Sequence, residues 1–261
     1  MSFSRRGFGA FFAAVAFLAV LFIGRVATAD FVGALVEVKV QAADDPSQEG
    51  MLRIAVPYEK VGSAPAERIR WRLEKALEVK SQHGAVLATI DDLDVDVEGD
   101  PKVSLSFAVT AGPAGSNFSI TSTTVSFSPL GSPLAFATAA VTVTDEDSNG
   151  AVATGLFPGA KIYQARYNSP AVAWADLIAS PVVVAPDDSL TAQGRRPTPS
   201  GREAMPGTVY SIASEFRFNL SPNDSASGTS TFDVLIPLPS AAYGITALLS
   251  CMGLARLRRQ R

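Results

Sequence analysis

Apolar and polar residues alternate with a period of two along much of the chain. Three segments show the pattern clearly: residues 36–40, 52–56 and 103–109. Alternate side chains of a β-strand point to opposite faces, so each segment is expected to form a half-buried strand. Further strands are expected at residues 118–127, 134–144, 151–156, 161–167, 181–185, 209–220 and 230–236. About ten strands separated by Gly, Pro, Asn and Ser turns predict an all-β fold, an antiparallel β-sandwich. Greek-key connections between its strands are compatible with this pattern.

Residues 68–80 fit both a helix and a strand. Helix-forming residue types are frequent here, and Ile69, Leu73 and Leu77 fall on one helical stripe. Strand alternation accounts for more positions, because Trp71 is also in phase with these residues while charged residues occupy the positions between them. We therefore expect a strand.

Residues 186–206 interrupt the alternation. The segment is rich in Pro, Gly and Arg and contains almost nothing apolar. Such a composition predicts a long exposed loop. Its three arginines could meet an acidic partner or a polysaccharide, but a solvated loop is the simpler interpretation.

The first 29 residues have the three parts of an export signal. These parts are the positive start at Arg5 and Arg6, the apolar residues 8–24, and a small-x-small cleavage site at Ala27 and Ala29 before Asp30. Residues 1–29 are therefore predicted to be a signal peptide with an apolar helix. An uncleaved anchor helix is the alternative, because 17 apolar residues approach the length that spans a bilayer. The paired arginines leave both the general secretory and the twin-arginine route open.

Residues 236–261 also have three parts. In order, they are the motif Ile236-Pro237-Leu238-Pro239, the apolar residues 240–255, and a basic cluster of Arg256, Arg258, Arg259 and Arg261. An arginine cluster stays on the cytoplasmic face, so the apolar helix would stop in the membrane with the body of the protein outside. The apolar run is short, and the prolines before it keep the chain extended and accessible, which suits a temporary anchor. A permanent anchor is the alternative.

This tail resembles the PEP-CTERM class of bacterial sorting signals, in a Pro-Leu-Pro variant. Pro237 and Pro239 match the motif of that class, and Leu238 stands where glutamate is commoner. The resemblance implies an exosortase-type membrane protease as partner, removal of the tail, and display at the cell surface or release into an exopolysaccharide matrix. Parts of the body, residues 88–93, 100–101 with 107–112, and 223–228, are also similar to stretches of exported proteins with such tails.

Charge is distributed unevenly along the chain. The 25 acidic and 22 basic residues give a net charge of -3, but seven arginines lie in the two terminal segments, which contain no acid. The body of the protein therefore has 15 bases against 25 acids, a net charge of -10. Such a body would repel a phosphate backbone, so we expect no nucleic-acid partner and favour metal cations or basic partners instead.

Catalytic chemistry has few candidate residues. The chain has one cysteine, Cys251 in the tail, and one histidine, His83, which precedes Gly84 in an expected turn. A disulfide framework, a Cys/His zinc cluster, a Cys/His nucleophile pair and a Ser/His/Asp triad with a choice of bases are therefore not expected. A glycosidase needs two carboxyls facing a sugar in a cleft, usually beside aromatic platforms. Because the acids cluster locally and only two tryptophans are present, we do not expect an enzyme.

Residues 145–150 reproduce the opening of a calcium-binding loop. Asp145, Asp147 and Asn149 supply oxygens at its first, third and fifth positions, and Gly150 stands at its sixth. The twelfth position, normally a bidentate glutamate, is Leu156, so we expect a weak calcium site at most. The alternative is a hairpin turn around the Asn149-Gly150 pair.

Six acids lie within residues 91–100. With the apolar residues of this segment facing inward, Asp94, Asp96 and Glu98 would share the outer face of a strand. A row of like charges is repulsive unless it is paired or bridged by a cation. The basic residues of 68–80 can lie beside this row across the turn at 81–84, which predicts a cross-strand charge ladder.

The sequence thus predicts a signal peptide at 1–29, an extracytoplasmic β-sandwich domain at 30–235 and a sorting signal at 236–261. We expect a non-enzymatic component of the cell surface or of an extracellular matrix, anchored in the inner membrane during transit. The alternative is an adhesin-like module that binds polysaccharide or another protein, with or without calcium. The export machinery, the exosortase-type protease and exopolysaccharide are the expected partners.

Overall fold

The computed structural model of the chain describes residues 30–55 and 68–235. These residues form β-strands and no helix, which confirms the all-β prediction. Within the same ranges there is accordingly no helix that is long and apolar enough to cross a membrane. The body of the chain, Thr28–Ile236, is one compact unit. The helices expected in residues 1–29 and 240–255 lie outside the described residues.

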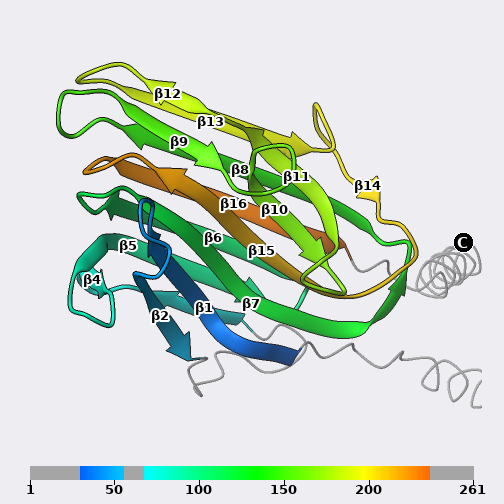
Figure 1. The fold of residues 1–261 in the computed structure, drawn as a ribbon. Helices are drawn as coiled ribbons and strands as arrows, with labels where there is room; N and C mark the ends of the chain where they lie inside the picture. Colours follow the sequence, from blue (N-terminus) through cyan, green and yellow to red (C-terminus); the bar gives the residue numbers. More distant parts are fainter. Residues whose placement is uncertain (1–29, 56–67, 236–261) are drawn as a thin grey trace, which may run out of the picture. The chain divides into compact units, whose positions relative to one another are not determined.

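The strands form two antiparallel sheets that lie face to face (Figure 1). Sheet A has the order β11-β10-β15-β7-β1-β2, with β9 beside β15 and β12 beside β9. Its strands are β1 (Asp30–Ala42), β2 (Glu49–Ala55), β7 (Ser116–Gly131), β9 (Ala151–Gly155), β10 (Lys161–Tyr167), β11 (Ala173–Ala179), β12 (Val182–Val184) and β15 (Thr208–Leu220). Sheet B has the order β13-β8-β16-β6-β5-β3, with β14 beside β8 and β4 beside β5. Its strands are β3 (Arg68–Arg72), β4 (Leu77–Lys80), β5 (Val86–Glu98), β6 (Lys102–Ala111), β8 (Leu134–Thr144), β13 (Ser189–Arg196), β14 (Glu203–Ala204) and β16 (Ser225–Leu235).

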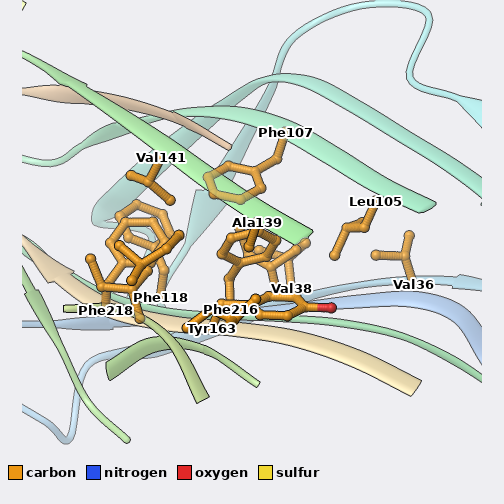
Figure 2. Close-up of a cluster of buried hydrophobic side chains, with 14 of the residues drawn as sticks. Val36, Val38, Leu105, Phe107, Phe118, Ala139, Val141, Tyr163, Phe216 and Phe218 are labelled. Atoms are coloured by element: carbon orange, nitrogen blue, oxygen red, sulfur yellow. The ribbon is translucent and has the colours of Figure 1, made fainter. Parts of the chain in front are cut away.

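One hydrophobic core lies between the sheets. The apolar residues of the predicted alternations at 36–40 and 103–109 are buried in it. Phe107 of sheet B meets Phe216 of sheet A edge to face with ring centroids 5.0 Å apart, and stacks on Phe218 at 5.8 Å (Figure 2). Phe118 stacks on Phe218 from within sheet A. Aromatic contacts between the two inner faces therefore join the layers.

Residues 68–80 are extended, as predicted, but form two strands instead of one. β3 and β4 both pair with β5, and residues 73–76 leave the ladder between them. The break is still tied to β5, because the Leu73 N–H donates to the carbonyl of Leu93 at 2.8 Å. Pairing with the long strand β5 therefore outweighs the helical propensity of this segment.

The prediction of an exposed loop at residues 186–206 is wrong over two stretches. Residues 189–196 form β13, which pairs with β8 along its whole length, and β14 also pairs with β8. β13 lies at the edge of sheet B and is largely exposed, so it needs few apolar residues. Gly194 allows the strand to pass close to sheet A, since a Cβ there would lie 3.0 Å from atoms of Leu177 and Ile178.

The hairpin interpretation of residues 145–150 is also wrong. β8 pairs with β13 and β16 in sheet B, whereas β9 pairs with β12 and β15 in sheet A. The two strands that flank the segment therefore belong to different sheets. Residues 145–150 form a crossover between the layers, with a left-handed backbone at Ser148 and Gly150.

The start of the first described strand and the end of the last one lie on the same side of the domain. Asp30 opens β1 opposite Ser126 of β7, and Leu235 closes β16 opposite Leu134 of β8. Since β7 and β8 are joined by a short turn, both positions lie toward that turn (Figure 1). The crossover at residues 145–150 lies at the other end of β8.

Candidate functional site

The outer face of sheet A carries polar residues in rows that run across the strands. One row contains Met51 of β2, Lys39 of β1, Ser119 of β7 and Arg217 of β15. The next row toward the β1–β2 turn contains Glu49, Gln41, Asn117 and Asn219. These side chains alternate with core residues such as Val38, Phe118 and Phe218, so the alternation that builds the core also builds this polar face.

A third row has a buried centre despite lying on the outer face. Its centre is Glu215, which is only 5% exposed. Glu215 accepts a hydrogen bond of 2.9 Å from Ser119, forms an ion pair with Arg166, and lies 3.7 Å from Arg217. Both of its carboxylate oxygens are therefore engaged.

The network continues from Arg166 across the neighbouring strands. The Arg166 Nε donates to Gln164 at 3.1 Å, and the Gln164 amide donates to Asp176 of β11 at 2.7 Å. Burial lowers the pKa of the Arg166 guanidinium, while the nearby Glu215 carboxylate acts in the opposite direction. The Arg166–Glu215 pair thus offsets two charges that would be costly to bury separately.

The connection between β9 and β10 covers this network. Phe157 in that connection is buried, with the guanidinium groups of Arg166 and Arg217 at 5.3 and 5.4 Å from its ring centroid. The connection folds tightly because of Gly155, where a Cβ would lie 2.3 Å from the Lys161 carbonyl carbon. A cation–π contact with the Phe157 ring helps to hold each of the two arginines in place.

A groove with a volume of about 620 Å³ lies beside the network; we call it the sheet A groove. Its floor is formed by β2, β1, β7 and β15, and its walls by the β4–β5 turn with Lys80, Ser81 and Gln82 and by Leu156 before β10. The first wall can approach because position 50 is glycine: a Cβ there would lie 2.5 Å from the carbonyl oxygen of Lys80. The volume falls in the range of ligand-binding sites.

The lining of the groove is mainly polar. Met51 and Leu156 are large apolar side chains that stay exposed, at 57% and 41%. The polar lining residues are Lys39, Gln41, Glu49, Lys80, Ser81, Gln82, Asn117, Ser119, Glu215 and Arg217. The groove therefore offers both hydrogen-bond donors and acceptors.

A separate acidic cluster lies where the crossover at residues 145–150 meets the β15–β16 turn. One carboxylate oxygen from each of Asp145, Asp147 and Asp224 lies within 4.8 Å of the others. Asp145 and Asp224 are buried, and Asp147 is exposed. Three carboxylates at this spacing are a ligand set that calcium would accept.

Asp145 is held by the backbone. Its Oδ1 accepts hydrogen bonds from the N–H groups of Asn149 at 3.3 Å and Gly150 at 3.0 Å, and its Oδ2 accepts one from Asp187 at 2.6 Å. These bonds lower the pKa of Asp145, the one from Asp187 most strongly. Asp145 therefore closes the crossover onto the β12–β13 turn, whether or not a cation is bound.

The pKa of Asp224 is shifted in the opposite direction to that of Asp145. Burial raises its pKa, and the negative charges of Asp147 and Asp145 raise it further, although hydrogen bonds from Ser221 and the Glu146 N–H act against the shift. Desolvation and like charges both disfavour the ionised carboxylate, which a bound cation would stabilise.

The structure brings together two of the three residues predicted to bind calcium. Asp145 and Asp147 meet, while Asn149 contributes its backbone N–H to Asp145. Asp224 was not predicted, because it follows Asp145 by 79 residues and belongs to a different turn. No local pattern indicates that these two turns meet.

The predicted charge ladder on β5 is confirmed. Arg70 contacts Asp94 at 3.1 Å, and Arg72 contacts Asp92 at 3.2 Å. Arg68 forms the third pair, with Asp96. Each arginine reaches diagonally to the acid that lies two positions along β5 from its direct partner in the ladder. These acids are thus balanced by β3 across the sheet.

The terminal site residues lie almost entirely outside the described residues. This holds for Ala27 and Ala29 of the cleavage site, for the motif at 236–239 and for the arginine cluster at 256–261. Asp30, the residue expected to follow signal cleavage, is the first residue of β1.

Comparison with known proteins finds no matching family model, no similar curated protein and no similar solved structure.

Proposed function

We propose that this protein is a non-enzymatic, exported component of the bacterial cell surface or extracellular matrix, with a β-sandwich domain delivered by its carboxyl-terminal sorting signal. The observation that carries the proposal is the tripartite tail at residues 236–261.

A structural role is supported by how the carboxylates are used. A glycosidase needs one carboxyl as general acid and a second as base or nucleophile across the sugar. In the sheet A groove the two carboxylates are Glu49 and Glu215, and Glu215 is already engaged by Ser119 and Arg166. Three acids of β5, Asp92, Asp94 and Asp96, are likewise paired with the arginines of β3.

Mass spectrometry of both ends of the protein from native cells tests the proposal. We expect a chain that begins at Asp30, ends near Pro237 or Pro239 and lacks Cys251. Recovery of surface protein that still carries Arg261 would contradict the transient anchor and show that the tail is a permanent one.

Two variants sharpen this test. Pro237→Ala with Pro239→Ala should leave the chain uncut in the inner-membrane fraction, because the extended motif before the apolar run is lost. A chain that ends at Leu235 should be exported without ever being anchored. The same mature ends in wild type and in the double proline variant would contradict the assigned motif.

A second candidate is a module that binds polysaccharide or another protein. The sheet A groove favours it, since a polar groove of this volume is not needed to stabilise two packed sheets. A glycan array with the purified protein separates the two candidates: specific sugar binding supports the module, and its absence leaves the structural role.

A further inference from the structure

We propose that the sheet A groove binds an extended polysaccharide that carries carboxylate groups, such as a chain of uronic acids. This proposal rests on the second candidate above, the binding module, and adds a site and a ligand class to it. Three features of the groove carry it: the type of its polar groups, its local charge and its rigid construction.

The polar groups of the groove match a ligand rich in hydroxyls. A sugar hydroxyl both donates and accepts hydrogen bonds, and the side chains of Gln41, Asn117 and Ser119 on the floor can do the same. Two large apolar side chains of the lining, Met51 and Leu156, are exposed and suit the C–H faces of sugar rings. A lipid or an apolar peptide anchor would need a larger apolar surface.

The charge of the groove differs from that of the body. Three cations line it, Lys39, Lys80 and Arg217, and only two carboxylates, in a body with a net charge of -10. Arg166 further offsets one of these carboxylates, Glu215, through their ion pair. The lining therefore carries one more positive than negative group in an acidic protein. Lys80 pairs with Glu78 at 2.8 Å outside the lining, an exposed pair that a carboxylate on the ligand can displace.

Two of these cations are placed to hold one carboxylate together. Lys39 and Arg217 lie in one row on either side of Ser119, so two strand spacings, about 10 Å, separate their backbones. Arg217 and Ser119 contact the same carboxylate oxygen of Glu215, and the long side chain of Lys39, which is 58% exposed, can extend toward them. Lys39 also pairs with Glu37 at 2.8 Å, but an exposed pair of this kind is weak and can be exchanged for a ligand.

The groove is built to keep its shape. Arg217 is held by the Phe157 ring and by Glu215, and Ser119 donates to the same carboxylate. The floor crosses four strands, a width of about 14 Å, so it suits a chain that lies across the sheet better than a single small molecule. Preformed positions reduce the entropy that is lost when a flexible polysaccharide binds.

Isothermal titration calorimetry with the purified full chain tests the proposal. The probes are alginate oligomers as polyuronate, dextran oligomers as a neutral sugar chain, and polyglutamate as an acidic chain without sugar rings. We expect alginate to bind, more weakly as salt is raised, and both other probes to bind at least about tenfold more weakly.

Charge-removing variants locate the site. Lys39→Gln and Arg217→Gln should each weaken alginate binding about tenfold, the loss expected for one charge-assisted hydrogen bond. The matched control is Arg70→Gln, which removes an exposed positive charge from the outer face of sheet B and should leave binding unchanged. If Arg217→Gln unfolds the domain because Arg217 belongs to the network, Lys39→Gln still decides the question.

Three results would overturn the proposal: no binding of alginate to wild type, equal binding of polyglutamate, or an equal loss of binding in Arg70→Gln. Equal binding of dextran would overturn the carboxylate requirement. None of these results bears on the mature ends of the chain. The proposed ligand of the groove and the proposed sorting signal can therefore be rejected independently of each other.

Discussion

Phe107 of β6 lies directly over Gly228 of β16. The two residues are partners in the ladder, and a Cβ built on Gly228 would lie 2.4 Å from ring atom Cε1 and 2.5 Å from Cζ of Phe107. Gly228 is not among the glycines with a left-handed backbone. A glycine is needed at position 228 because the Phe107 ring occupies the space that a side chain there would fill. From this position the ring contacts Phe216 and Phe218 of the other sheet.

Substitution at either residue should destabilise the domain. Phe107→Ala removes a ring that is 3% exposed and should lower the free energy of unfolding by about 3 to 5 kcal/mol. Gly228→Ala forces the ring to move and should cost about 1 to 3 kcal/mol. Urea unfolding followed by circular dichroism measures both. In the Phe107→Ala background, Gly228→Ala should cost almost nothing; additive losses would show that the ring is not what excludes a side chain at 228.

The Arg166–Glu215 pair gives a second prediction. Arg166→Met leaves the buried Glu215 without its main counterion and should destabilise the domain by about 2 to 4 kcal/mol. Adding Glu215→Gln removes the uncompensated charge, so the double variant should be more stable than Arg166→Met alone. Urea unfolding of the three variants tests this, and a double variant that loses the sum of the two single losses would mean that the charges do not interact.

Alkaline pH should lower the stability of the domain through the buried Tyr163. Burial raises the pKa of this fully buried phenol to about 12, against about 10 in the unfolded chain. Below pH 10 both states hold the proton and the stability is unaffected by pH. Above it only the unfolded state ionises, so the free energy of unfolding should fall by about 2 to 3 kcal/mol between pH 10 and pH 12.

The Tyr163→Phe variant isolates this effect from other groups that titrate at high pH. At pH 8 it should be less stable than wild type by about 1 kcal/mol, because the hydrogen bond of 2.9 Å with Ser214 is lost. Between pH 10 and pH 12 the difference should shrink or reverse. A constant difference across this range would contradict the raised pKa.

The acidic cluster gives a test for calcium. With carboxylates from Asp145, Asp147 and Asp224 but no bidentate glutamate, we expect a dissociation constant of about 10⁻⁴ to 10⁻³ M. Calcium at ten times that concentration should stabilise the folded state by about 1.4 kcal/mol. Thermal unfolding with and without calcium measures the shift.

Asp147→Asn is the informative variant because Asp147 is exposed and accepts a long side-chain hydrogen bond of 3.4 Å from the Asn223 amide. It should abolish the calcium-dependent shift without lowering the melting point in the absence of calcium. Asp145→Ala should lower the melting point under both conditions, since it removes three backbone hydrogen bonds. The same calcium shift in Asp147→Asn and wild type would leave Asp145 with only its role in closing the crossover.

Much of the fold could be predicted because alternation and burial agree in the long strands. In β5, Leu93, Val95 and Val97 are fully buried, as their spacing indicated. The same phase put the acids of this strand on the outer face, and that was enough to predict the ladder with the basic residues of 68–80. Period-two patterns are reliable where one face of a strand is buried and the other is exposed.

The elements that were missed lack this contrast. In β11 two buried residues lie on each side of the exposed Asp176, so its burial does not alternate from one residue to the next, and Ile178 has a left-handed backbone. β13 has the opposite problem, because it is an edge strand with little buried surface. The sequence of β11 does not alternate with a period of two, and the alternation in β13 rests on Leu190, Ala192 and Gly194, of which only Leu190 is large.

The candidate sites were harder to predict than the fold. The sheet A groove joins residues of β1, β2, β7 and β15 with two connections, so it depends on the order of the strands, which alternation does not reveal. Glu215 is buried only because the β9–β10 connection covers an outer face. The Asp145–Asp224 contact likewise depends on two turns that meet in space.

The position of Leu235 has a mechanical consequence. It closes β16, which is hydrogen-bonded to β8 over Ser225–Leu235 and to β6 over Ser225–Asp233, in the middle of sheet B. The sheet A groove lies toward the opposite end of the strands, beside the β1–β2 turn. In a chain held by its carboxyl end and loaded at the groove, tension would run along the strands and shear both ladders of β16 at once. Their hydrogen bonds would then resist the load together instead of opening one after another.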